Sequence, residues 1–593
     1  MLRGSFVPVV RVKALGKSTT NTFTFNKMKK YHFMLLATGL VCLNACQKVV
    51  NSNEEIIEDA DIVTYIHANE ESSSTSKASI DNLDASFSWN TNDRIAVYAD
   101  GYKISDPLAD TYNGTNEATF AFSGANAVTE SNRADFAIFP ASLVWDGSAI
   151  RTNSASNHTS TSLTLTLPAS YTLEQVQDEL SPCPMIAANA PNGDLSFKHL
   201  CALLRVEVSD VPATTRRLVF VFNGNKVQGE FTLTGVDPGT SSIETAVASG
   251  SNNTITVFTP DIDAVSTLTI NLPLPTGTYE YITIGAYDKA EGGLPIYTQS
   301  RLIKKSSPGT WTSDRLSSRK ISAALSQVAF SVSSTKKVIF SPGNLQAKTE
   351  DLGAHWTWDF APTQYTAIKN NTANTTITGK GTVSANGTID LFGYSTDHVN
   401  NFFGIIKSNR DNYYSDGPTS GAFVDWGTNS IGEYAPNYWH TMSKSEWEYL
   451  LDTRDAPKFA KVSVNGVDGL LLFPDQFTWN MTSIPSTVDN INGIYNSTNC
   501  SISLSSWNNL EAAGVVFLPG TGYRSQNENT VNNLSPARGY YWFSDTNGKQ
   551  SGSGTTYDNN STFYLYFGQG NIWSTTSTMT KRCGVAVRLV HEL

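Results

Sequence analysis

Cysteine is the residue type in this chain with the widest chemistry, because its thiol can be acylated, oxidised to a disulfide or bound to a metal. The 593-residue sequence holds six, at positions 42, 46, 183, 201, 500 and 583. Cys183 with Cys201 and Cys500 with Cys583 could form disulfides within their domains or remain buried thiols. Six cysteines are too few for disulfides to stabilise so long a chain, so its cores must be stabilised by burial of apolar side chains.

The other reactive residue types do not form a catalytic pattern. The sequence shows no Ser-His-Asp grouping and no His-Glu-x-x-His run. Gly16-Lys17-Ser18 lacks the earlier glycine of a phosphate-binding loop. We therefore expect no enzyme, and we expect no cofactor or metal.

Charge and composition point to an exported protein. Lys plus Arg number 42 against 53 Asp plus Glu, which gives a net charge of -11. Nucleic-acid binding depends on clustered cations, so this balance predicts no nucleic-acid partner. Charged residues make up only 16%, while Ser, Thr, Asn and Gly are abundant, as in an extracellular β-rich protein with many turns.

An export signal occupies residues 28–46. Met28 begins a short basic stretch, and an apolar run follows from Phe33 to Leu43. The run is too short to span a membrane and is typical of a secretory signal peptide. Leu43-Asn44-Ala45 before Cys46 resembles the lipobox of bacterial lipoproteins, which implies lipid attachment at Cys46, a palmitoylated anchor and the outer membrane. Residues 1–46 are then an upstream extension plus signal, and the acidic stretch 47–60 is a tether.

The next part of the chain alternates apolar and polar residues in short runs. Examples are Ala85–Trp89, Arg94–Tyr98 and Ser162–Leu167. Alternation of this kind puts one face of a strand in a core and the other in water. We expect a mainly β tandem of two sandwiches, at 61–194 and 195–325, with one helical candidate at Leu173–Leu180.

The strand motifs of this region carry a family resemblance. The run Trp89–Tyr98, an aromatic strand ending at Pro140 and the run Leu195–Val206 resemble the fimbrillin-type proteins of Bacteroides and Porphyromonas over about 57–325. The resemblance implies two transthyretin-like sandwiches and partnership with other fimbrial subunits by β-strand addition. Stalk subunits of that family are cut after an arginine near the first strand, and no arginine lies between Cys46 and Arg94. Subunits at the tip or base can escape such cutting.

A compositional change near Val328 marks a third domain, 328–593, with nine of the twelve tryptophans after residue 350. Ser443 followed by Glu446 predicts a capping box and a helix that buries Trp447, Leu450 and Leu451. A second short helix is expected near Leu510. Aromatic strands are expected at 539–544 and 562–567, with a final strand at 583–590.

The order of these motifs resembles the C-type-lectin-like α+β fold, in the branch shared with formylglycine-generating-enzyme-like domains. In that branch, the segment between the last two motifs displays a ligand-binding platform. Here this implies a ligand-binding set of Asp545, Asn547, Tyr557, Asp558, Asn559, Asn571 and Trp573. Aromatic residues supply rigid contact area or stack on sugar rings, and Asn, Ser and Gly adapt their hydrogen bonds. Trp542 and Phe567 are expected in the core.

Two chemistries of the same branch are disfavoured by the residues. Trp507-Asn508-Asn509 matches half of a calcium-dependent sugar site, but Phe473-Pro474-Asp475 is a poor partner for it. Cys500 and Cys583 do not fit the reactive cysteine pair of the oxidases. The prediction is therefore a fimbrial tip adhesin whose last domain binds a host or bacterial glycan or protein. The alternatives are a surface glycan-binding lipoprotein for polysaccharide uptake and an enzyme on the lectin-like scaffold.

Overall fold

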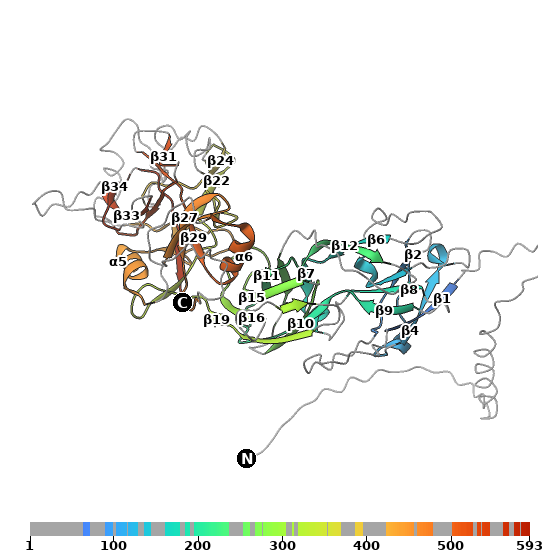
Figure 1. Ribbon diagram of the computed structural model, residues 1–593. Coiled ribbons are helices and arrows are strands. Elements are labelled where there is room, and N and C mark those ends of the chain that lie inside the picture. The colour runs from blue at the N-terminus through green and yellow to red at the C-terminus, as the bar shows by residue number, and fades with distance from the viewer. Residues whose placement is uncertain are drawn as a thin grey trace, which may run out of the picture. The chain divides into compact units, whose positions relative to one another are not determined.

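The computed structural model confirms the mainly β class (Figure 1). It describes residues 63–70, 89–98, 102–115, 117–128, 136–143, 161–177, 184–189, 195–236, 253–303 without 261, 263–266 and 276, 311–313, 318–368 without 353, 386–394, 423–455, 459–477, 501–525, 530–545 without 535–536, and 561–593 without 569–574 and 582. Within these ranges no helix is long and apolar enough to cross a membrane. The chain from Ile62 to Leu593 forms one compact unit. The tandem-sandwich and lectin-like assignments stay predictions.

The first sheet has seven strands in the order β3-β2-β5-β8-β9-β1-β4. Its core is built around Trp89, whose ring meets Phe120, Phe139 and Phe197 edge-on at 5.0, 5.1 and 5.6 Å. Edge-to-face packing of this kind suits the charge distribution of aromatic rings. The strands are β1 (Val63–Glu70), β2 (Ala96–Tyr98), β3 (Tyr102–Ile104), β4 (Glu117–Ser123), β5 (Phe136–Phe139), β8 (Met185–Asn189) and β9 (Leu195–His199).

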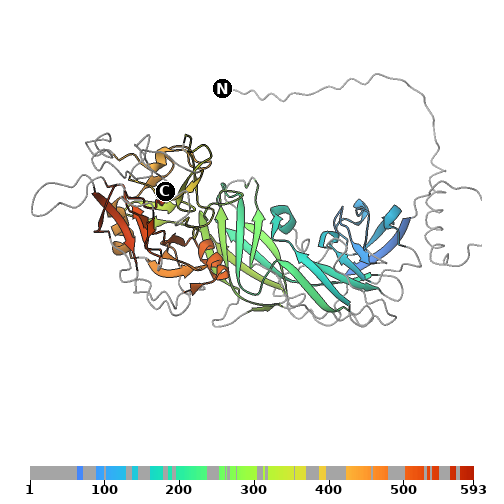
Figure 2. The ribbon, with the colours of Figure 1, turned by 90° about the horizontal axis from the view of Figure 1, so that it is seen from above.

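The next region packs a three-stranded sheet, β14-β10-β18, against a sheet of order β19-β16-β15-β11-β13-β7, with β17 added on β15 (Figure 2). Alternate residues of β13 are buried, as the period-two pattern predicts. The strands are β7 (Ser170–Thr172), β10 (Ala202–Ser209), β11 (Arg217–Gly224), β13 (Thr254–Phe258), β14 (Leu268–Leu274), β15 (Gly277–Tyr287), β16 (Tyr297–Leu302), β17 (Trp311–Ser313), β18 (Ser318–Ala324) and β19 (Ser326–Gln327).

Strand pairing crosses the sequence-based boundary at 194/195. β9 lies C-terminal to that boundary but pairs with β8 and β1 in the first sheet. β7 lies before it but pairs with β13, and β6 (Thr161–Leu167) pairs with β12 (Gly229–Val236). The expected helix is present as α2 (Leu173–Gln177). These two regions therefore interleave along the sequence.

In its described residues, the C-terminal region, 328–593, is made of small sheets and two α-helices. β21 (Lys337–Phe340), near its start, pairs with its last strand, β35 (Leu589–Glu592), so the ends of the region close on each other. The predicted capping box is confirmed at α5 (Lys444–Glu448), where Ser443 and Glu446 each bond the other's backbone. Trp447 is buried on this helix, and Leu450 and Leu451 are buried in the following turn. The second helix, α6 (Leu504–Ala512), is also confirmed.

Helix α6 is held against the region of β11 and β15 by direct hydrogen bonds. The Thr298 hydroxyl donates to the carbonyl of Ala512 at 2.6 Å, and the amide of Val328 donates to Ile296 at 2.8 Å. Two buried asparagines, Asn253 and Asn509, donate across the same contact at 3.5 Å. The C-terminal region is thus bonded to the sheet that precedes it.

Candidate functional site

Two neighbouring strands of the C-terminal region, β32 (Gly539–Trp542) and β33 (Ser561–Phe567), are aromatic on both faces. Their register sets Tyr540 opposite Tyr566 and Trp542 opposite Tyr564. Because side chains alternate along a strand, these four residues share one face. Tyr541, Leu565 and Phe567 face the other way and belong to a separate core. Trp542 and Phe567 are 1% and 0% exposed, which confirms their predicted core placement.

The first face carries a group of tyrosines that we call the tyrosine cluster: Tyr523, Tyr540, Tyr564 and Tyr566. Tyr540 lies at its centre, with ring centroids 4.8 Å from Tyr523, 5.7 Å from Tyr564 and 5.2 Å from Tyr566. Tyr523 comes from β30 (Tyr523–Arg524), which pairs with β31 (Val531–Asn532). Tyr540 and Tyr564 are buried, whereas Tyr523 and Tyr566 are half-buried, so each of these two residues keeps some contact with solvent.

Asn533 fixes the hydroxyl of the central tyrosine. Its amide nitrogen donates to the Tyr540 oxygen at 2.6 Å, from a backbone with φ of 61°. Asparagine tolerates this left-handed conformation better than most residues. Burial raises the pKa of Tyr540 to about 12, so its hydroxyl stays neutral at physiological pH. The cluster therefore offers neutral rings and hydroxyl groups.

Two cations lie at the edge of the tyrosine cluster. Nη1 of Arg538 donates to the hydroxyl of Tyr566 at 3.4 Å, and Arg538 is half-buried. Nζ of Lys461, from β26 (Phe459–Val464), donates to the carbonyl of Gly568. A Cβ on Gly568 would lie 2.2 Å from the Tyr566 hydroxyl and 3.3 Å from Arg538, so only glycine allows this close approach.

The positive charges of Lys461 and Arg538 interact. Burial lowers the pKa of Lys461, Asp468 opposes that shift, and the positive charge of Arg538 adds to it. Lys461 is 5% exposed, so its ammonium is held inside the region while Arg538 stays accessible. The edge of the cluster therefore combines aromatic surface with a local excess of positive charge.

Of the seven predicted ligand-binding residues, the structure describes Asp545. Its carboxylate Oδ2 accepts a hydrogen bond from the amide of Lys444, the first residue of α5. Its carbonyl accepts from the hydroxyls of Tyr394, at 2.5 Å, and Thr562. Asp545 thus ties the end of β32 to the start of α5, and its contact with a ligand stays a prediction. The other predicted positions, and the lipid site, lie outside the described residues: Asn547, Tyr557, Asp558, Asn559, Asn571, Trp573 and Cys46.

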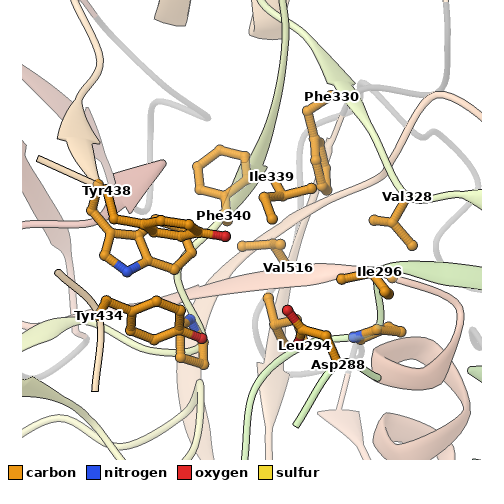
Figure 3. Close-up of a pocket in the computed structure, with 14 residues that line it drawn as sticks. Asp288, Leu294, Ile296, Val328, Phe330, Ile339, Phe340, Tyr434, Tyr438 and Val516 are labelled. Atoms are coloured by element: carbon orange, nitrogen blue, oxygen red, sulfur yellow. The ribbon is translucent and has the colours of Figure 1, made fainter. Parts of the chain in front are cut away.

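A cavity lies where the β15 region meets the C-terminal region (Figure 3). Tyr434 and Tyr438 line one side of it, and Ile296, Val328 and Phe330 line the other. Its volume is about 30 Å³, roughly the space of one water molecule in the liquid. A volume this small offers little room for a ligand, so we assign the cavity to packing.

The candidate metal and thiol chemistries gain no support from the described residues. Trp507 and Asn509 of the calcium-like motif are buried on α6, and the Asn509 amide bonds to Phe222. In the described part of the chain, no three His, Cys, Asp or Glu side chains gather to hold a metal ion. Cys201 and Cys583 are buried, and their possible partners Cys183 and Cys500 lie outside the described ranges.

Comparisons with known proteins give distant likenesses only. No family profile and no curated protein matches the sequence. Solved structures from Bacteroides ovatus, Bacteroides uniformis and Parabacteroides distasonis, each provisionally assigned as a cell adhesion protein, are similar at 11, 10 and 9% identity. They cover 40, 44 and 40% of this chain and 86, 96 and 78% of their own, with TM-scores of 0.23, 0.24 and 0.20. At TM-scores below 0.5, these similarities establish neither a common fold nor a shared function.

Sequence reasoning missed the tyrosine cluster as a unit. Tyr540 and Tyr566 were each expected within a strand, but their pairing depends on the register between two strands. The sequence did contain a signal for the cluster. Aromatic residues stand at positions 540 and 542 and again at 564 and 566, two positions apart as on one face of a strand. Arg538 and Lys461 gave no signal, since each is a single cation, Arg538 directly before β32 and Lys461 within β26.

Proposed function

We propose that this chain is a surface-displayed adhesin whose C-terminal region binds a glycan through the tyrosine cluster. The observation that carries the proposal is the pair of half-buried rings, Tyr523 and Tyr566, packed about the buried Tyr540. Rings held by their neighbours lose little entropy on binding, and a pyranose stacks on such surfaces through its C–H face. Arg538 and Asn532 beside them offer hydrogen-bonding groups for sugar hydroxyls.

The rest of the chain fits a role in display. In the proposal, the lipid on Cys46 anchors the protein to the outer membrane, and the β regions join other fimbrial subunits by strand addition. β4 and β3 are the edge strands of the first sheet among the described residues, and an unpaired edge is what strand addition needs. The C-terminal region would then stand at the tip of the fimbrium.

The test is binding of residues 62–593, the compact unit, to glycan and host-matrix arrays. The isolated C-terminal region is less suitable, because it would uncover the face of α6 that bonds to Thr298 and Asn253. A Tyr523→Ala/Tyr566→Ala double variant should lose binding, since both rings reach the surface. Tyr112→Ala, a half-buried tyrosine of the first sheet region, is the matched control and should bind normally. Undiminished binding by the double variant would refute the tyrosine cluster as the site.

A further inference from the structure

We infer that the tyrosine cluster takes a sugar that carries an anionic group, a carboxylate or a sulfate, and that Arg538 pairs with that charge. This inference rests on the proposed glycan-binding function and specifies its ligand class. The sugar ring would lie on Tyr523 and Tyr566, and its anionic group would point toward Arg538.

The first step of the argument is the environment of Arg538. Its guanidinium has five N–H donors. Toward the residues that the structure describes, its side chain makes one bond, a long one of 3.4 Å from Nη1 to the hydroxyl of Tyr566. Among the described residues, no carboxylate forms an ion pair with Arg538, although it is half-buried. A partly desolvated arginine with spare donors is well suited to bidentate pairing with a carboxylate or sulfate.

The second step is the charge around it. Lys461 lies close enough to Arg538 for the two charges to interact, and Asp468 is the carboxylate that acts on Lys461. Among the described residues that act on Lys461, Asp468 is a carboxylate and Arg538 a second cation, so these three charges sum to a positive value. The chain as a whole carries -11, so this edge differs in sign from the average of the chain and would attract an anionic ligand.

The third step is geometry. Arg538 Nη1 and the Tyr566 hydroxyl are within hydrogen-bonding distance, so the cation sits at the rim of the ring and not beneath it. Tyr540 contacts both Tyr523 and Tyr566, so the three rings form one continuous aromatic group with Arg538 at the Tyr566 hydroxyl. A saccharide stacked across these rings would therefore end beside the guanidinium. Asn533 is already bonded to Tyr540 and does not compete for the anion.

The experiment measures the affinity of residues 62–593 for matched probes that differ only in charge. Oligogalacturonate is compared with its methyl ester, and dextran sulfate with dextran, so the two pairs separate a carboxylate from a sulfate source. We expect one or both acidic probes to bind about tenfold or more tightly than their neutral partners. High salt should weaken the acidic probes selectively.

Variants assign that preference to Arg538. Arg538→Gln should lower affinity for the acidic probe about tenfold or more, and should weaken the neutral probe far less, because glutamine keeps a hydrogen-bonding amide but not the charge. Arg538→Lys should recover part of the loss, because it restores charge without the planar fork. Arg301→Gln, an exposed arginine of β16, is the matched control and should bind as the wild type does. Thermal unfolding of each variant verifies that the fold is retained.

The alternative outcomes separate the two levels of inference. If neutral and acidic probes bind equally and Arg538→Gln has no effect, the anionic specificity is wrong and glycan binding stands. If Arg301→Gln weakens the acidic probe as much as Arg538→Gln does, the attraction is a general surface effect and the inference fails. If the wild type binds no saccharide, both the inference and the proposed function fail.

Discussion

The second β region and the C-terminal region fill their interiors with different residues. The core shared by β10, β11, β14 and β15 is mostly Val, Leu and Ile, which face inward at alternate positions. The C-terminal region has a core rich in Trp, Tyr and Phe. Of the residues that the structure describes, the buried Lys, Arg, Asp and Glu side chains all lie in the C-terminal region: Asp390, Arg454, Lys461, Arg524, Lys581 and Arg588.

The buried cations of the C-terminal region donate hydrogen bonds to backbone carbonyls. Arg454 donates to the carbonyls of Leu450 and Phe473 at 2.8 and 2.7 Å, and Arg524 donates to Leu391 at 3.5 Å. Lys461 and Arg588 also donate to backbone carbonyls. Buried carbonyls need a hydrogen-bond donor, and long strand ladders supply one automatically. In the C-terminal region, these cations supply donors to carbonyls in helical, strand and loop segments.

The largest expected effect comes from removing one of these cations. Arg454→Met should lower the free energy of unfolding by about 3–5 kcal/mol, because it leaves two carbonyls without this donor and removes the 3.1 Å ion pair to Asp475. Ile284→Met, a volume-conserving change in β15, should cost less than about 1.5 kcal/mol. Hydrogen exchange resolved by region measures both. Equal losses of unfolding free energy in the two variants would contradict the proposed difference between the two regions.

The next largest expected loss of stability comes from the close packing of Phe567 against Gly539. A Cβ on Gly539 would lie 1.9 Å from the ring of Phe567, so Gly539→Ala should cost about 1–3 kcal/mol through overpacking. Gly285 in β15 is the matched position, because its Cβ would meet nothing nearer than 3.0 Å. Gly285→Ala should therefore be milder. Tryptophan fluorescence during chemical unfolding reports on Gly539→Ala, since nine of the twelve tryptophans follow residue 350.

Two carboxyl groups, Asp93 near the first sheet and Asp475 in the C-terminal region, should respond differently to acid. Burial raises the pKa of Asp93, near the first sheet, from 3.8 to about 6. The folded state then binds the proton more tightly than the unfolded state, so stability of this region should fall as pH rises from about 4 to 6, by roughly 1–3 kcal/mol. Asp93→Asn should abolish this dependence of stability on pH. Hydrogen exchange, corrected for the intrinsic effect of pH on the exchange rate, measures it.

The pKa of Asp475, in the C-terminal region, is shifted in the opposite direction. Burial opposes ionisation there, but bonds from Ser331 and the charge of Arg454 outweigh it and hold the pKa of Asp475 below 3.8. Its contribution is present above pH 3.8 and is lost as pH falls below that value. The C-terminal region should therefore show no loss from Asp475 over the range in which Asp93 titrates. A loss of stability between about pH 4 and 6 that is present in the wild type and absent in Asp475→Asn would contradict this assignment.

The smallest predicted effect concerns the start of α5. Ser443→Ala removes the hydroxyl that accepts from the Glu446 amide and should cost about 1 kcal/mol. Ser443→Thr keeps a hydroxyl and should restore most of it. Exchange of the α5 amides measures the change, and a silent Ser443→Ala would show that Asp545, bonded to Lys444, is sufficient to hold the helix start.

The sequence alone predicted the features that depend on neighbours along the chain. Period-two alternation indicated strands such as β13, and Ser443 with Glu446 indicated the capping box of α5. Trp542 and Phe567 were also predicted as core. These signals are readable because strand faces and helix caps are set within a few residues.

Only the tertiary structure decided which segments meet. The register between β32 and β33 brings Tyr540 and Tyr566 together, and the bond from Lys444 to Asp545 joins residues 101 positions apart. The pairing of β7 with β13 and of β9 with β1 likewise crosses the 194/195 boundary that was predicted from the strand patterns. Lys461 and Arg538 share an edge for the same reason. Contacts of this kind depend on how the whole chain packs, and no local period or propensity along the sequence encodes them.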